Sequence, residues 1–143
     1  MASEEELDYI IEAAGRFYAD AGFEYPDNAR EYYESLNINP LIFTVVDTGK
    51  GFIVGMIAPS FLEPDKLACT ELAWYVEPEY RGTSVAIKLM KRYEKKAIES
   101  RCDIVTMVAL NSLNPDKVGA IYKKMGYNTL EHHYIKEFNY GSN

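Results

Sequence analysis

Hydrophobic residues recur at helical spacing over the first part of the chain. Across residues 3–22, apolar side chains return every third or fourth position, and Ser3 with Glu6 forms a capping-box pattern at the start. A shorter segment, residues 25–36, has the same spacing and is rich in tyrosine. The chain is therefore predicted to begin with two amphipathic helices.

The hydrophobic period then changes from helical to strand-like. Residues 40–59 contain two runs of β-branched and aromatic residues on either side of Asp-Thr-Gly-Lys-Gly, which predicts a β-hairpin. Residues 66–78 are predicted to form a third strand after a short loop. Because successive strands with short connections form meanders, we expect these three to be antiparallel.

The second half of the chain alternates between helix and strand. A helical pattern lies within residues 76–97, and the near-continuous apolar run at 102–110 predicts a strand buried on both faces. A further helix is predicted within 114–127 and a final strand at 127–138. A strand–helix–strand unit requires a crossover, so we expect an α/β (α+β) fold with a mixed, mainly antiparallel sheet flanked by helices.

Length and composition indicate one domain over residues 1–143. Hydrophobic residues make up 48% and charged residues 26% of the chain, which excludes disordered and fibrous classes. The apolar runs are only strand-length and the N-terminal residues are acidic, so neither a membrane span nor an export signal is predicted. Cys69 and Cys102 fit no disulfide framework and no metal-ligand spacing, and we expect a cytoplasmic protein without a metal site.

The net charge narrows the classes of partner. A charge of −7 disfavours general nucleic-acid binding and is compatible with a basic or cationic partner. Lysine and arginine nevertheless concentrate in residues 88–96. That local excess is either part of a site for an anionic ligand or a solvated helix face.

Small and polar residues occupy the turn between the third strand and the next helix. The first amide groups of a helix have no partner within it, so together with the helix dipole they form a site for phosphate or pyrophosphate. Gly82, Ser84 and Ala86 are small enough for a ligand to approach the backbone. Arg81 adds positive charge, and Thr83 or Ser84 adds a hydroxyl. Turn formation and helix capping explain the same residues equally well, so both interpretations stay open.

Two segments resemble motifs of one family. Residues 72–94, Leu-Ala-Trp-Tyr-Val-Glu-Pro-Glu-Tyr-Arg-Gly-Thr-Ser-Val-Ala and onward, resemble the acyl-CoA-binding motif of the GNAT N-acetyltransferase superfamily: Arg or Gln, two residues, Gly or Ala, one residue, Gly or Ala. Residues 114–127 are similar to the following motif of that family, a tyrosine followed by a short helical turn and Gly-Phe or Gly-Tyr. The resemblance covers about residues 41–138, and Ser84 departs from it where Gly or Ala is usual.

The resemblance implies a V-shaped cleft, between the third meander strand and its parallel neighbour, that takes acetyl-CoA as co-substrate. A second departure is that many members start with an extra edge strand, whereas here Ser3 already begins the first helix, which would leave the strand from Leu41 as an exposed edge or a homodimer contact. The backbone of residues 74–76 would contact the pantetheine arm, and the loop of residues 81–86 would surround the pyrophosphate. The CoA-binding residues implied are Trp74, Tyr75, Val76, Arg81, Gly82, Thr83, Ser84, Val85, Ala86, Lys88, Asn111 and Asn114.

Two residues correspond to catalytic positions of the family. Tyr122 matches the tyrosine that protonates the leaving thiolate, although it could also be a core tyrosine with a satisfied hydroxyl. Glu71 lies within an apolar strand, where the family often places a general base. It could also be an outward-facing residue of a strand with one solvated face.

The resemblance leads to the hypothesis of an acetyl-CoA-dependent N-acetyltransferase that transfers the acetyl group directly to an amine, either a small molecule or a peptide. The alternative is a CoA-binding protein of the same fold that acts without catalysis through a protein partner. The first two helices usually border the acceptor in this family, and here they carry many carboxylates and aromatic rings. The aromatic residues are Phe17, Tyr18, Phe23, Tyr25, Tyr32 and Tyr33.

Overall fold

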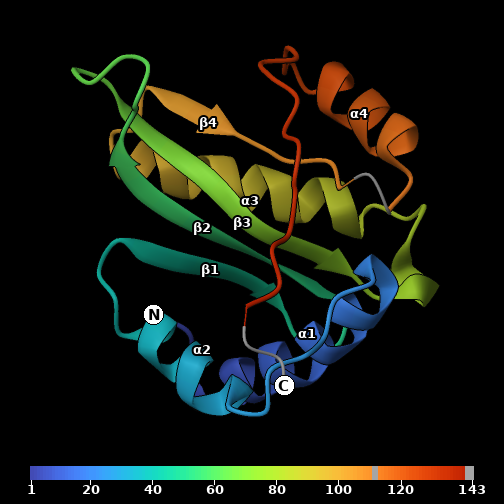
Figure 1. Cartoon of the computed structure of the whole chain (residues 1–143). Helices are drawn as coiled ribbons and strands as arrows, with labels where there is room; N and C mark the ends of the chain where they lie inside the picture. The colour runs from blue at the N-terminus through green and yellow to red at the C-terminus, as the bar shows by residue number, and fades with distance from the viewer. Residues whose placement is uncertain (111–112, 141–143) are drawn as a thin grey trace.

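A computed structural model describes residues 1–110 and 113–140 of the chain. Figure 1 shows a central sheet with helices on both sides. Within the described ranges no helix combines the length and the apolar character needed to cross a membrane. The elements are α1 (Glu4–Ala21), α2 (Ala29–Asn37), β1 (Ile42–Asp47), β2 (Gly51–Pro59), β3 (Leu67–Val76), the 3-10 helix η1 (Pro78–Tyr80), α3 (Val85–Glu99), β4 (Ile104–Thr106) and α4 (Pro115–Lys124).

The sheet has the order β1-β2-β3-β4, so each strand lies beside its neighbour in sequence. The pairs β1–β2 and β2–β3 are antiparallel, and β3–β4 is parallel, which confirms the predicted meander and crossover. Among the described residues no strand precedes α1, and β1 forms the edge of the sheet. The predicted fold class is therefore confirmed.

Two hydrophobic clusters lie on opposite faces of the sheet. On one face α1 and α2 pack against side chains that include Phe52 and Val54. On the other face α3 and α4 pack against side chains that include Ile53 and Cys69. Adjacent residues of β2 thus enter different clusters, as the alternation of side chains along a strand requires.

The first helix forms as its sequence pattern predicts. The backbone amide of Glu6 donates to the Ser3 hydroxyl at 3.2 Å, and the amide of Ser3 donates to the Glu6 carboxylate at 3.0 Å. Gly22 follows the helix with φ of 85°, a left-handed conformation that glycine adopts without a side-chain clash. These local contacts hold α1 in place beneath the sheet.

The predicted strand at residues 102–110 is much shorter than expected and is not buried on both faces. Only Ile104–Thr106 form β4, and all three residues are half-buried. β4 has β3 as its neighbour on one side, and the sheet ends there. Because a strand persists only where a neighbour supplies hydrogen bonds, the apolar residues beyond Thr106 leave the sheet.

The predicted final strand at residues 127–138 is wrong. The structure describes residues 127–140 and shows no strand there. The residues alternate as in a strand, yet Tyr134 is 93% exposed and Ile135 is 80% exposed. Alternation alone does not make a strand, since the segment hydrogen-bonds to no neighbouring strand within the described part of the chain.

Candidate active site

The strands β3 and β4 pair over a short length and then separate. Ala68, Cys69 and Thr70 of β3 lie opposite residues 104–106, whereas β3 continues to Val76 without a partner on that side. A pocket of about 110 Å³ lies between the separated segments. Its lining includes Glu71, Leu72 and Trp74 of β3, the segment 108–110, Phe17 of α1 and Val118 of α4. The cleft implied by the sequence resemblance is thus present.

A β-bulge at Leu72 determines which side chains reach this pocket. Val54 of β2 lies opposite Ala73 and Gly55 lies opposite Glu71, so Leu72 has no partner in the register. In a regular strand Glu71 and Trp74 would point to opposite faces. The extra residue places both on the face covered by α3 and α4.

Glu71 is a buried carboxylate within the pocket, with 7% of its surface exposed. Its Oε1 accepts a hydrogen bond from the backbone N–H of Val108 at 3.4 Å. Burial raises the pKa of Glu71 to about 7, and the Val108 N–H opposes that rise only in part. The outward-facing interpretation of Glu71 is wrong, because Glu71 is buried and lies on the same face of β3 as the buried Cys69.

Tyr122 approaches the same point from α4. Its side chain is buried, and its hydroxyl donates a hydrogen bond to the carbonyl of Val108. Its ring centroid lies 5.7 Å from that of Trp74. Burial, and then the charge of Glu71, raise the pKa of Tyr122, so the phenol keeps its proton at neutral pH. The structure therefore brings the two predicted catalytic residues together, each bonded to the peptide groups of Val108.

The loop before α3, where the sequence predicts an anion site, is open beside part of its backbone. Gly82 adopts φ of 79°, and a side chain added there would meet no atom within 4 Å, so the space beside its backbone is open. The Thr83 hydroxyl donates to the Tyr80 carbonyl and accepts from the amide of Val85 at 3.3 Å. Thr83 rather than Ser84 therefore caps α3. Ser84 occupies the capping position without a side-chain hydrogen bond and is exposed.

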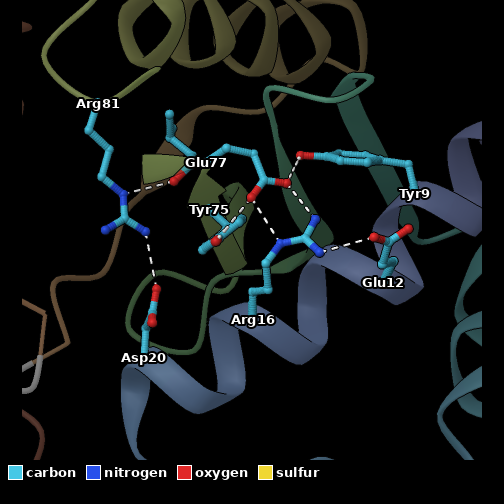
Figure 2. A network of polar contacts seen from close by, with 8 residues as sticks. Tyr9, Glu12, Arg16, Asp20, Tyr75, Glu77 and Arg81 are labelled. Atoms are coloured by element: carbon cyan, nitrogen blue, oxygen red, sulfur yellow. Dashed lines mark hydrogen bonds and ion pairs between the residues drawn. The ribbon is translucent and has the colours of Figure 1, made fainter. Parts of the chain in front are cut away.

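Of the two basic residues predicted to bind phosphate, Arg81 does not point toward the start of α3. Lys88 is exposed in the first turns of α3. The guanidinium of Arg81 points instead toward α1, and its Nη2 lies 3.2 Å from a carboxylate oxygen of Asp20 on that helix (Figure 2). Its Nε donates to the carbonyl of Val76, the last residue of β3, at 2.8 Å. The positive charge expected from Arg81 is therefore already paired.

The other predicted CoA contacts fall into three groups. The side chains of Tyr75 and Val76 are buried in opposite core clusters, so only their backbone groups remain available to a ligand. Trp74 is half-buried and lines the pocket. Asn114 is exposed before α4 in a left-handed conformation, and Asn111 lies outside the described residues.

Glu77 was not anticipated from the sequence. It follows β3 directly, is 5% exposed, and accepts hydrogen bonds from Tyr9, Arg16 and Tyr75 (Figure 2). A carboxylate directly after an apolar run is the kind of sequence signal that also drew attention to Glu71. Its partners in α1 could not be inferred, because they lie 61 and 68 residues away in sequence.

Comparisons with known proteins agree with this geometry. The model of the acetyltransferase (GNAT) family matches residues 7–127, which is most of the chain. No match is found among curated protein sequences.

Several solved structures share the fold. A transcriptional regulator from Bacillus halodurans C-125 is 13% identical with a TM-score of 0.79, and the match covers 96% of each chain. A ribosomal-protein-alanine N-acetyltransferase from Brucella melitensis biovar Abortus 2308 is 20% identical with a TM-score of 0.68, over 93% of this chain and 94% of that one. AAC(6′)-Iy, in complex with the bisubstrate analogue CoA-S-monomethyl-acetylneamine, is 12% identical with a TM-score of 0.77, and the match covers 95% of this chain and 93% of that one. The chain therefore belongs to the acetyltransferase (GNAT) family and is an N-acetyltransferase with acetyl-CoA as its co-substrate.

Proposed function

We propose that this protein transfers an acetyl group directly from acetyl-CoA to the amine of a small molecule or peptide, with Glu71 as general base and Tyr122 as general acid. One observation supports these roles above all. Glu71 lines the pocket where β3 and β4 separate, the buried Tyr122 packs against its lining residue Trp74, and both side chains bond to Val108. A purely CoA-binding role through a partner gives no reason for a carboxyl and a phenol to converge there.

The proposed reaction has one bond-forming and one bond-breaking change. The amine nitrogen attacks the thioester carbonyl, forming the C–N bond, and its proton passes to Glu71, directly or through water. As the tetrahedral intermediate collapses, the C–S bond breaks and the thiolate takes the phenolic proton of Tyr122. Backbone N–H groups polarise the thioester carbonyl. A carboxyl whose pKa lies at about 7 is suited to accept a proton near neutral pH.

The proposed position of the cofactor follows from the loop before α3 and from the pocket between β3 and β4. The pyrophosphate lies at the N-terminus of α3 against the amides of residues 82–86, where helix amides and dipole favour an anion. Lys88 is close enough in sequence to approach a phosphate, and Ser84 leaves its hydroxyl free for one. The pantetheine arm follows the backbone of residues 74–76 into the pocket. Asn111 and Asn114 remain proposed contacts of this arm.

The experiment is an acceptor screen that measures free CoA thiol. With an accepted amine, Tyr122→Phe should lower kcat by roughly 100-fold and leave the CoA dissociation constant unchanged, because the hydroxyl acts only as the thiolate forms. Glu71→Ala should lower kcat/KM by a similar factor. Unchanged turnover in both variants would refute the assigned roles.

The amine is proposed to approach from the α1 side. Phe17 of α1 lines the pocket, whereas Tyr33 is buried in the core between the helices and the sheet. The net charge of −7 supports a cationic acceptor. The acceptor pocket is accordingly proposed to use Phe17 and not the whole set of aromatic residues in the first two helices.

We also infer a homodimer through the edge of β1, which has β2 on one side only in the described sheet. Light scattering at micromolar concentration should give twice the mass of 16.3 kDa, and a monomeric mass would contradict the dimer. The free thiols of Cys69 and Cys102 support a cytoplasmic location.

A further inference from the structure

The first residue after β3 joins the pyrophosphate loop to α1. The carboxylate of Glu77 accepts hydrogen bonds from the Tyr9 hydroxyl at 2.8 Å, from Arg16 Nε at 3.0 Å and Nη2 at 2.7 Å, and from the Tyr75 hydroxyl at 3.2 Å. Figure 2 shows these donors surrounding the carboxylate. Burial alone would raise the pKa of Glu77, but the bonds from Arg16 and Tyr9 outweigh it and lower that pKa. Glu77 is therefore an ionised residue fixed to the middle of α1.

The other contact between this loop and α1 involves Arg81. Its guanidinium bonds to the Val76 carbonyl and to Asp20, near the end of α1, and lies 5.4 Å from the Tyr75 ring centroid. Tyr75 also donates to Glu77, so the two sets of contacts share this residue. The beginning of the loop and its middle are thus each tied to α1.

The direction of Arg81 separates it from the proposed anion site. In Figure 2 its side chain extends away from α3 and toward Asp20 on α1. The amides proposed to hold pyrophosphate lie at the N-terminus of α3. An arginine that bridges a carbonyl and a carboxylate uses the fixed fork of its guanidinium, which a lysine lacks.

We propose that Arg81 and Glu77 are positioning residues, which hold the loop 77–84 against α1 so that its amides meet the pyrophosphate, and that Arg81 itself does not contact the phosphates. This inference rests on the proposed function, since it assumes that the loop binds CoA. In this proposal α1 supports cofactor binding by holding the loop in place, a role that the sequence of the helix does not indicate.

The test compares two matched substitutions on α1. Asp20→Asn breaks the pair with Arg81, whose side chains are 47% and 41% exposed. Asp8→Asn breaks a similarly exposed pair with Arg30 of α2, which is not a residue of the loop. Both variants lose one negative charge, which by itself would favour an anionic ligand. Isothermal titration with CoA should show about threefold weaker binding for Asp20→Asn than for Asp8→Asn.

Arg81→Lys gives an independent result, because it keeps the charge and loses the fork. It should weaken CoA binding about tenfold if Arg81 positions the loop. Pantetheine, which lacks the pyrophosphate, is titrated into the same variants by NMR. Its affinity should not change, whereas an equal loss for both ligands would indicate general damage to the fold and overturn the proposal.

The remaining outcomes separate this inference from the proposed function. Tighter CoA binding by Asp20→Asn than by Asp8→Asn, or full affinity in Arg81→Lys, would overturn the positioning role of Arg81 and favour a direct contact with phosphate. Equal affinities of Asp20→Asn and Asp8→Asn, with a wild-type protein that binds CoA, would overturn the positioning role alone. A wild-type protein that binds no CoA would overturn the proposed function together with the inference.

Discussion

Glu71 shows how one inserted residue changes the chemistry of a strand. A carboxylate inside an apolar strand is costly unless it is paired, and among the described residues Glu71 accepts its hydrogen bond from the Val108 N–H at 3.4 Å. Its burial therefore destabilises the ionised form, which is the form that a general base requires. The ionised form of Glu71 therefore costs stability, and the proposed role as general base gives that cost a reason.

This cost predicts a pH-dependent effect of Glu71→Gln. The pKa of Glu71 is about 7 in the folded state and 4.5 for an ordinary glutamate. The folded state therefore binds the proton more tightly and loses stability as the pH rises between these values. The glutamine side chain of the variant does not ionise and so avoids this loss. We expect the free energy of unfolding of Glu71→Gln, relative to wild type, to be about 2 kcal/mol larger at pH 8 than at pH 5. Chemical denaturation at both pH values measures it, and an equal difference at both would contradict the buried carboxylate.

The sequence identified residues better when their role depends on local pattern or motif than when it depends on distant contacts. Tyr122 and Glu71 were found through the family motifs, and the structure brings them together. The importance of Glu77 depends on α1, which no spacing in the sequence connects to it. The direction of Arg81 likewise depends on Asp20, so its charge was expected at the phosphates and lies elsewhere.

At the scale of elements, the bulge in β3 is set by its register with β2. Gly55 lies opposite Glu71 at the point where the register shifts. A side chain there would come within 2.7 Å of the Tyr93 ring on α3 and 3.0 Å of the Phe43 ring. β2 therefore needs glycine for the close approach of the helix beside the bulge.

Gly55→Ala should lower the free energy of unfolding by about 2 kcal/mol, because the rings must move to accommodate the added carbon. Gly119→Ala is the matched control within α4, where an added side chain meets no atom within 4 Å. That change should stabilise the protein by about 0.5–1 kcal/mol. Urea denaturation of both variants measures the contrast, and similar stabilities would argue against the close packing at Gly55.

The predictable and unpredictable elements differ in what stabilises them. α1 and the β1–β2 hairpin form where local capping, turn residues and periodicity agree. The segment 127–138 has the alternation of a strand but no neighbour to pair with, and β4 is consequently short. Strand pairing is a property of the whole sheet, which local pattern does not determine.

At the scale of the whole molecule, the site lies where the two layers of helices meet the divided sheet. α1 reaches it from one face with Phe17, and α4 reaches it from the other with Val118. The separation of β3 from β4 opens the space between them, and the loop from β3 to α3 leads to its edge. Cofactor binding is therefore expected to depend on both layers.

The most direct test of this account is a crystal structure of the protein with CoA. We predict that pyrophosphate oxygens lie within about 3.2 Å of backbone nitrogens of residues 82–86, and that the cofactor sulfur lies at the pocket beside the Tyr122 hydroxyl. Arg81 should still contact Asp20 in that structure. CoA bound without contact to these loop amides, or with its sulfur remote from Tyr122, would contradict the central claim.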